Sequence, residues 1–207
     1  MTEGPGGDNG QSCQELALPG ARLQYWPEWL QAKDAERCFE LLQSDLDWQQ
    51  PELRLYGRSV PIPRRQVWMG DAHCSYRYSG LLFEPVPWHP LVLQLTNQLN
   101  QQTGLGFNAV LLNWYANGQE HMGWHSDDEP ELGRAPQIAS LSLGEERWFE
   151  LSHKTQGMQF KLMLQHGSLL LMGGDCQRFW RHRVAKMAKA QQGRINLTFR
   201  KLIKTAK

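Results

Sequence analysis

The residues of this sequence best suited to metal chemistry are His125 and Asp127, which are separated by one position in "GWHSDDEPELG". On an extended strand, side chains at i and i+2 leave the same face, so an imidazole and a carboxylate can converge on one ion. The candidate third ligand is His182, because the strand-like segment around it follows the buried stretch "GSLLLM". Two histidines and one carboxylate on one side of an ion form the facial triad that suits non-haem Fe(II).

The acidic residues that follow the triplet have a simpler explanation. H-x-D triplets are common, and most are hydrogen-bonded or solvated surface groups. Asp128, Glu129 and Glu131 continue the acidic run, which by itself is typical of a solvated loop. Spacing alone therefore favours a surface loop, and the metal hypothesis depends on residues elsewhere in the chain.

Residues 194–201, "RINLTFRK", alternate polar and apolar side chains. A strand would send one set to one face, namely Arg194, Asn196, Thr198 and Arg200, and the other set to the core, namely Ile195, Leu197 and Phe199. Two arginines on the inner face of a buried strand need anions, and a guanidinium binds a planar carboxylate through paired hydrogen bonds. The pattern predicts a dicarboxylate site, although an edge strand with both arginines in water shows the same alternation. Asn113 and Tyr115 in "NWY" would also share one face of a strand and offer neutral hydrogen-bonding groups.

The elements that must position these side chains are mostly short strands. After Gly106, turn residues separate the apolar segments "FNAVLLNWY", "QIASLSLG", "RWFELSHK", "MQFKLMLQ", "GSLLLMGG", "HRVAK" and "RINLTFRKL". So many strands without intervening helices favour an antiparallel sandwich or barrel. Apolar residues at helical spacing predict one helix over 29–48 and a second that begins near Pro90 and stops at Gly104. The predicted fold class is mainly β with flanking helices, an α+β arrangement.

Composition restricts the class of protein. The chain has 207 residues and a formal net charge of +1, so no global field marks a nucleic-acid or membrane partner. Residues 1–14 are Gly-rich and polar and predict a disordered leader, and 15–207 fit a single domain. Four scattered cysteines without CxxC spacing favour a reducing intracellular compartment. We see neither a signal peptide nor an apolar run long enough to cross a bilayer.

Taken in order, N-x-Y, H-x-D, the distant histidine and R-x-N-x-T-x-R resemble the AlkB family of Fe(II)/2-oxoglutarate-dependent dioxygenases. The stretches "YRYSG" at 76–80, "QIASLSLG" at 137–144 and "HGSLLLM" at 166–172 resemble its nucleic-acid demethylase branch, nearest to the second AlkB homologue and related bacterial proteins. The resemblance covers residues 64–201, and the N-terminal third matches only loosely. It implies a double-stranded β-helix, the jelly-roll sandwich, in agreement with the strand-rich pattern.

The resemblance also implies a cofactor site. The implied iron ligands are His125, Asp127 and His182. The residues implied to bind 2-oxoglutarate are Arg200 at its keto-acid end, Arg194, Asn113 and Tyr115 at its distal carboxylate, and Asn196 and Thr198 along the pocket. With O2 as the third reactant, the implied reaction converts 2-oxoglutarate to succinate and hydroxylates an N-alkyl group, which leaves as an aldehyde. Protein groups would mainly position the reactants.

An aromatic pocket is expected on the substrate side, because chemistry on a base requires removing the base from its stack. Tyr76 and Tyr78 would share one face of "SYRYSG", which resembles the family's substrate lid and also contains Ser79. Trp124, next to a predicted ligand, is a further candidate wall. Core packing is the more frequent role for any single tryptophan.

Charged residues near the predicted site suggest two further contacts. Asp128 and Glu129 stand where a negative group would attract a methylated, cationic base. Arg64 and Arg65 in "PRRQ" are candidates for phosphate contacts, although basic pairs are usually solvated. Residues 53–63 offer no clear match to the base wedge of the relatives.

The leading hypothesis is an oxidative demethylase that repairs N-alkylated bases of the 1-methyladenine and 3-methylcytosine type in DNA, with RNA as a further substrate. One alternative is an AlkB-like hydroxylase or demethylase of tRNA, protein or lipid. Another is a nucleic-acid-binding jelly roll without catalysis, against which the intact triplet and both arginines count. We expect an intracellular monomer without a membrane partner, cytoplasmic in a bacterium or nuclear in a eukaryote.

Overall fold

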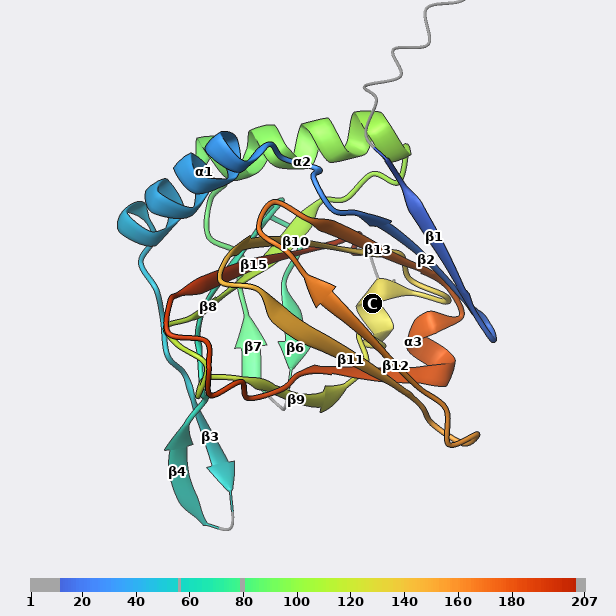
Figure 1. Ribbon diagram of the computed structural model, residues 1–207. Helices are drawn as coiled ribbons and strands as arrows, with labels where there is room; N and C mark the ends of the chain where they lie inside the picture. The colour runs from blue at the N-terminus through green and yellow to red at the C-terminus, as the bar shows by residue number, and fades with distance from the viewer. Residues whose placement is uncertain (1–11, 56, 79–80, 204–207) are drawn as a thin grey trace, which may run out of the picture.

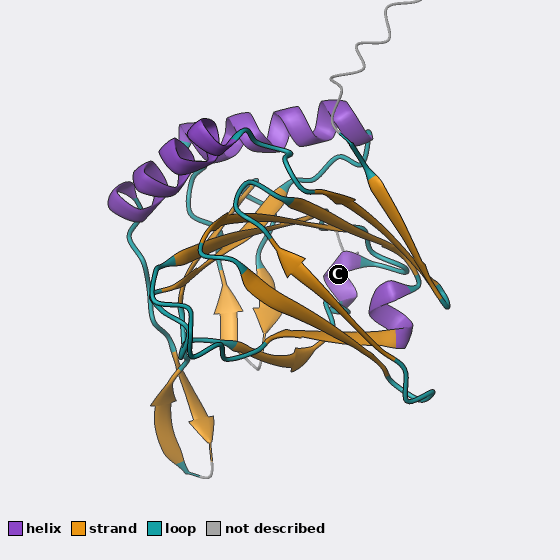
Figure 2. Ribbon diagram, viewed as in Figure 1, coloured by secondary structure: helices purple, strands orange, loops and turns teal. Residues whose placement is uncertain are grey.

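Two antiparallel sheets face each other in the computed structural model, which describes residues 12–55, 57–78 and 81–203 (Figures 1 and 2). The larger, seven-stranded sheet has the order β1 (Gln14–Leu18), β2 (Ala21–Trp26), β13 (Leu169–Gly174), β10 (Ile138–Gly144), β15 (Arg194–Arg200), β8 (Ala109–Tyr115) and β5 (Arg65–Gly70). The smaller, four-stranded sheet has the order β12 (Gln159–Leu164), β11 (Arg147–His153), β14 (Trp180–Val184) and β9 (Met122–His125). This arrangement confirms the predicted antiparallel sandwich.

Helices cover the outer face of the larger sheet. Figure 1 shows α1 (Ala32–Asp45) and α2 (Pro90–Thr103) side by side above it, while the short α3 (Cys176–Phe179) leads directly into β14. The predicted helix over 29–48 is therefore shorter at both ends. The second helix ends as predicted, because Gly104 has φ +69° and its N–H caps the carbonyl of Asn100 at 2.8 Å.

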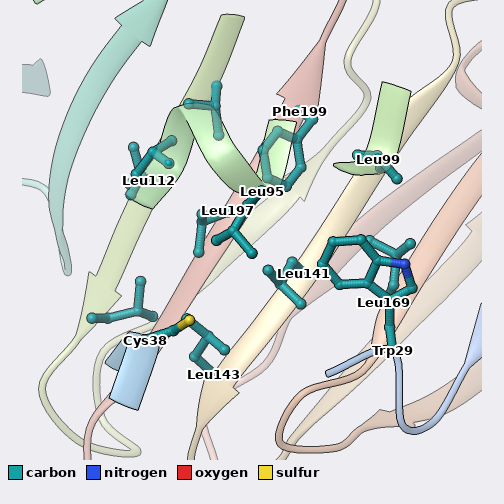
Figure 3. Packing of buried hydrophobic residues seen from close by; sticks show 14 of the residues in the cluster. Trp29, Cys38, Leu95, Leu99, Leu112, Leu141, Leu143, Leu169, Leu197 and Phe199 are labelled. Carbon is teal, nitrogen blue, oxygen red and sulfur yellow. The ribbon is translucent and has the colours of Figure 1, made fainter. Parts of the chain in front are cut away.

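The main hydrophobic core lies between these helices and the larger sheet. Figure 3 shows Trp29, Cys38, Leu95 and Leu99 directed toward aliphatic side chains of the sheet. The sheet side of this core includes Leu112, Leu141, Leu143, Leu169, Leu197 and Phe199. A second core lies between the two sheets and includes Ile138 of β10, Leu170 of β13 and Leu151 of β11. Each buried leucine contributes about 1.5–3 kcal/mol of transfer free energy, so the two layers are firmly held together.

Two small hairpins stand apart from the sandwich. They are formed by β3 (Glu52–Leu55) with β4 (Arg58–Pro61), and by β6 (Tyr76–Tyr78) with β7 (Leu81–Phe83). Figure 1 shows β3 and β4 projecting away from the sheets. A 3-10 turn, Pro130–Leu132, follows the acidic stretch.

The N-terminal prediction needs one correction. Residues 1–11 of the predicted leader lie outside the described residues, but Gln14 is the first residue of β1, which pairs with β2. The ordered structure thus begins before the predicted boundary. Among the helices of the described ranges, we find none that is long and apolar enough to cross a membrane.

Candidate metal and cosubstrate site

Three side chains converge between the two sheets, those of Asp127 and His182 buried and that of His125 half-buried. His125 at the end of β9 is paired in register with His182 of β14, and their ring centroids are 4.2 Å apart. Asp127 follows β9, and its carboxylate Oδ2 lies 3.6 Å from Nε2 of His182. One ligand atom of each residue lies within 4.8 Å of the other two. Asp127 therefore reaches the cluster from a loop, whereas the i, i+2 spacing was considered with both side chains on one extended strand.

Hydrogen bonds orient two of these side chains. His125 Nδ1 lies 2.9 Å from the carbonyl of Gly123, so when Nδ1 carries the proton, Nε2 is left as the ligand atom. Arg200 Nη2 donates to Asp127 Oδ1 at 2.5 Å, which leaves Oδ2 facing the histidines. Each ligand thus keeps one electron-pair donor directed into the cluster.

Protonation states in the cluster also suit a cation. Burial, followed by the neighbouring His125, lowers the pKa of His182 to about 3. Burial also lowers the pKa of His125. Burial alone would raise the pKa of Asp127, but Arg200 and the two histidines outweigh it and lower the value. Near neutral pH the cluster therefore holds two neutral imidazoles and one carboxylate, the forms that bind metal ions.

Strand β15 of the larger sheet carries a buried guanidinium that has no anionic partner among the described residues. Arg194 is 1% exposed, and its Nη2 donates to Ser142 Oγ at 2.9 Å. Its Nε and Nη1 are buried without hydrogen-bond partners, and no carboxylate of the described residues pairs with it. Burial lowers the pKa of Arg194 to about 10, yet the group remains charged at neutral pH. A carboxylate would supply the missing acceptors and the compensating charge.

The remaining residues predicted for the cosubstrate lie around the same cavity. Those that line it, besides the three clustered side chains, include Asn113, Tyr115, Ser140, Asn196, Thr198 and Arg200. In register, Asn196 is opposite Asn113, and Arg194 is opposite Tyr115. β15 lies between β10 and β8, so the edge-strand alternative is excluded. The structure brings all six predicted residues to one region, and the guanidinium of Arg194 lies 5.5 Å from the ring of Tyr115.

Two predicted substrate residues occupy other places than expected. Arg64 is buried, and its Nε donates to Asn113 Oδ1 at 2.9 Å, so it supports the cavity wall and is not a surface phosphate contact. Trp124 lies on the outer face of the smaller sheet, where the guanidinium carbons of Arg181 and Arg183 are 5.2 and 4.5 Å from its ring centroid. Because successive strand residues point to opposite faces, Trp124 points away from its neighbour His125, and it does not line the cavity.

The other candidate substrate residues differ in their exposure and in their contacts. Arg65 is partly exposed, with Nη1 3.7 Å from Glu120 and its guanidinium 4.9 Å from the Trp114 ring. The Asp128 side chain is 64% exposed and pairs with Lys154 at 3.6 Å, outside the cavity. Glu129 is partly buried, and burial raises its pKa.

The lid prediction is only partly covered by the structure. The backbone of Tyr76 and Tyr78 belongs to β6, but the places of their side chains lie outside the described structure. Ser79 lies outside the described residues altogether. A role of these three residues in holding a base therefore stays a prediction.

Sequence reasoning missed several residues that shape the site. Ser140 and Ser142 accept hydrogen bonds from Asn196 and Arg194, a role that the alternation S-x-S in "IASLSLG" could have suggested. The buried Arg147 donates from Nη2 to the carbonyls of Glu120 and Ala185, at 2.9 and 2.7 Å, and so fixes the loops beside Tyr115. No spacing in the sequence marks Arg147.

A jelly-roll sandwich that encloses two histidines, a carboxylate and an unpaired buried arginine has the arrangement of an Fe(II)- and 2-oxoglutarate-dependent oxygenase. The chain belongs to the 2OG-Fe(II) oxygenase superfamily, whose family model matches residues 22–200.

Within this superfamily, the chain is similar to two groups of relatives. The chain is 41% identical over 190 residues to alpha-ketoglutarate-dependent dioxygenase alkB homolog 3 of Bos taurus, a match that covers 87% of this chain and 66% of the relative. It is 34% identical over 216 residues to DNA oxidative demethylase ALKBH2 of Homo sapiens, covering 99% and 82% of the two chains. Of these two, homolog 3 is the more similar, whereas the sequence patterns had suggested the second homologue. The match spans about two thirds of homolog 3.

Solved structures support the fold. OsALKBH1 aligns with a TM-score of 0.60 at 21% identity and covers 92% of this chain and 100% of that chain. A prolyl-4-hydroxylase from Pseudomonas putida aligns with a TM-score of 0.54 at 13% identity, covering 89% and 93%. At such low identity these likenesses confirm the predicted jelly roll and carry no information about substrate.

Proposed function

We propose that this protein is an oxidative demethylase that removes N-linked alkyl groups from bases in DNA, of the 1-methyladenine and 3-methylcytosine type, and that it also accepts RNA. The observation that carries the proposal is the cavity lined by the His125, Asp127 and His182 cluster and by β15, beside which the buried Arg194 has no anionic partner among the described residues. This set of groups offers ligands for one metal ion and a counter-charge for a carboxylate. The similarity to an alpha-ketoglutarate-dependent dioxygenase supports the type of reaction, and the similarity to a DNA oxidative demethylase supports the class of substrate.

In this proposal His125, Asp127 and His182 hold Fe(II), and Arg194 takes the distal carboxylate of 2-oxoglutarate beside Tyr115. When bound, the iron and 2-oxoglutarate supply the O2-dependent hydroxylation that releases the alkyl group as an aldehyde. Arg200 keeps the carboxylate of Asp127 ionised and fixes its orientation, because it donates a hydrogen bond to Oδ1 and leaves Oδ2 for the metal.

The other cavity residues prepare the site for this chemistry. Asn196 donates to Ser140 Oγ at 2.8 Å and accepts from Thr198 at 3.0 Å, so its amide is fixed along the floor of the pocket. Leu111, Phe149, Met172 and Val184 form apolar walls that limit access of water. Positioned groups in a water-poor cavity contribute to catalysis because they do not need to reorganise as charge moves.

The substrate would enter from the side of the acidic loop and the β6–β7 hairpin. Glu129 is the acidic residue that we place nearest to the alkylated base, because it is partly buried and its pKa reflects both Asp127 and Arg200. A cationic methylated base is attracted by such a partly shielded carboxylate. Tyr76 and Tyr78 of the hairpin are proposed to cover the base, together with Ser79, which follows Tyr78 in the sequence.

The test combines the purified full chain with Fe(II), 2-oxoglutarate and oligonucleotides that contain 1-methyladenine or 3-methylcytosine. We expect formaldehyde and succinate to form in step with loss of the methyl group, on single strands, duplexes or both. The matched unmethylated oligonucleotide should give neither repair nor formaldehyde. Absence of repair on DNA and RNA, in protein shown to contain iron at the triad, would contradict the proposal and favour a protein or lipid substrate.

The organisation and setting of the protein are also proposals. We propose a single dioxygenase domain over 15–207 that acts as a monomer without a membrane partner, inside a bacterial cytoplasm or a eukaryotic nucleus. The four cysteines are free thiols, and three of them are buried, which supports a reducing compartment. Light scattering during size-exclusion chromatography should give the mass of one chain. The mass of a dimer would contradict the proposal of a monomer.

A further inference from the structure

Asp127 lies where no strand ladder holds it. β9 ends at His125, so the backbone of the metal-binding loop after it must be fixed by other contacts. Arg200 holds the carboxylate of Asp127, but the carboxylate can still turn with the backbone. The backbone N–H of Asp127 donates to the side chain of Gln177, with Oε1 at 3.0 Å.

Gln177 is itself firmly held. Its side chain is buried at 1% exposure, and its Nε2 lies 3.8 Å from the sulfur of Met172. The Nζ of Lys154 donates to the carbonyl of Gln177 at 2.9 Å. Restrained at both its side chain and its backbone, Gln177 can impose its own position on the N–H of Asp127.

The segment that carries Gln177 also carries a metal ligand. Gln177 belongs to α3, which leads into β14 and His182 five positions later. A second bond joins the same two segments, because Ser126 Oγ donates to the carbonyl of Trp180 at 2.9 Å. The short path from Gln177 to His182 therefore fixes the separation of two ligands that come from distant parts of the sequence.

We propose that Gln177 is a positioning residue for the metal: through its amide oxygen it sets the place of Asp127 relative to His182. The inference rests on the proposed function only in taking Asp127 as a ligand. Residues that orient metal ligands without touching the metal commonly change metal affinity about 10- to 100-fold when replaced. A purely structural Gln177 would change the stability of the fold without such a change in affinity.

The test measures binding of Mn(II) alone to the full chain, from the electron paramagnetic resonance signal of free Mn(II), without cosubstrate or nucleic acid. Gln177→Met keeps the length of the side chain and removes the acceptor, so we expect the Kd for Mn(II) to rise about 10- to 100-fold. Gln177→Glu keeps an acceptor oxygen and should bind Mn(II) at least tenfold more tightly than the methionine variant. Asp127→Ala should abolish binding and thereby locate the measured site.

Thr96→Val is the matched control for the loss of one buried side-chain hydrogen bond. Thr96 is buried at 2% exposure in α2, on the other side of the larger sheet, and donates one hydrogen bond to the carbonyl of Val92. This variant should leave Mn(II) affinity unchanged. If Gln177→Met does not fold, the shorter Gln177→Asn replaces it, with the same expected weakening.

Unchanged Mn(II) affinity in a folded Gln177→Met or Gln177→Asn protein would overturn the inference, as would equal weakening in Thr96→Val. This outcome is separate from that of the repair assay, because no substrate is present. A wild-type protein that binds Mn(II) in a Gln177-dependent way but repairs no base would overturn the proposed function and leave the positioning role standing.

Discussion

Asp127 joins the two halves of the candidate site, because it faces the histidines on one side and Arg200 on the other. Asp127→Ala should abolish metal binding and turnover, since an alanine leaves only two histidines as ligands and removes the one carboxylate of the cluster. The measurement is repair of a methylated oligonucleotide together with metal content. Retained turnover would show that the triad is wrongly assigned.

Arg194 is predicted to contribute to function at a cost in stability. Replacing this buried, unpaired cation by methionine removes a desolvated charge, so Arg194→Met should raise the unfolding free energy of the protein without cosubstrate. The same change should raise the KM for 2-oxoglutarate roughly 10- to 100-fold, as expected for loss of one or two charge-assisted hydrogen bonds. Arg22→Ala, at an exposed ion pair, is the control and should alter neither quantity. An unchanged KM in Arg194→Met would remove Arg194 from the cosubstrate site.

His182 predicts how the metal-free protein responds to acid. Its pKa in the fold is about 3, below the ordinary 6.5, so the unfolded chain binds the proton more readily. The stability that this difference provides is complete above about pH 6.5 and is lost as the pH falls toward 3. Denaturant titrations of the metal-free chain at pH 7.5 and 5.5 should show this loss, and it should be smaller in His182→Gln. An equal loss in that variant would assign the acid sensitivity to other groups.

The places of single residues could be predicted from the sequence where alternation or spacing indicates which side chains share one face of a strand. The R-x-N-x-T-x-R pattern identified the inner face of β15 because a strand has a strict period of two. Arg64 and Trp124 were misplaced, since neither local charge nor proximity to a ligand indicates which face of the sheet a side chain takes. Gln177 carried no signal, because its role depends on a loop 50 positions earlier in the sequence.

At the scale of elements, β15 is the strand on which the site depends. The face of β15 toward the cavity carries residues proposed to bind 2-oxoglutarate. The opposite face packs against the helices, where Leu197 is fully buried. Leu197→Ala should lower the unfolding free energy by about 2–5 kcal/mol through lost burial and a residual cavity. Leu93→Ala on the exposed side of α2 should cost no more than about 0.5 kcal/mol. Equal small effects in urea titrations would show that β15 is not packed as described.

The strands after Gly106 other than β9, and both long helices, followed from apolar periodicity, which local burial enforces. β1 and β2 were not predicted, because their sequences, "QELAL" and "ARLQYW", mix polar and apolar residues in a way that is also typical of a loop. β1 pairs with β2, and β2 pairs with β13, a contact between distant parts of the chain. The i, i+2 spacing was considered with Asp127 on an extended strand, because the sequence did not reveal where β9 ends.

At the scale of the whole molecule, the net charge of +1 predicts that the protein binds nucleic acid through a few local contacts with phosphates. If no more than about four phosphates are neutralised, the affinity for a single strand should fall with salt at a log-log slope no steeper than about −3. Fluorescence anisotropy at several salt concentrations measures this slope. A much steeper dependence would require a broad basic surface that the described residues do not suggest.

We propose that one cavity between the two sheets binds iron and 2-oxoglutarate and that the protein uses them to demethylate bases in nucleic acid. The most direct test follows one 1-methyladenine oligonucleotide by mass spectrometry while succinate is measured in the same reaction. We predict that the wild-type chain with Fe(II) restores adenine with matching formation of succinate, and that Asp127→Ala does neither. Iron-loaded wild-type protein that leaves the methyl group in place, or Asp127→Ala protein that removes it, would contradict the account.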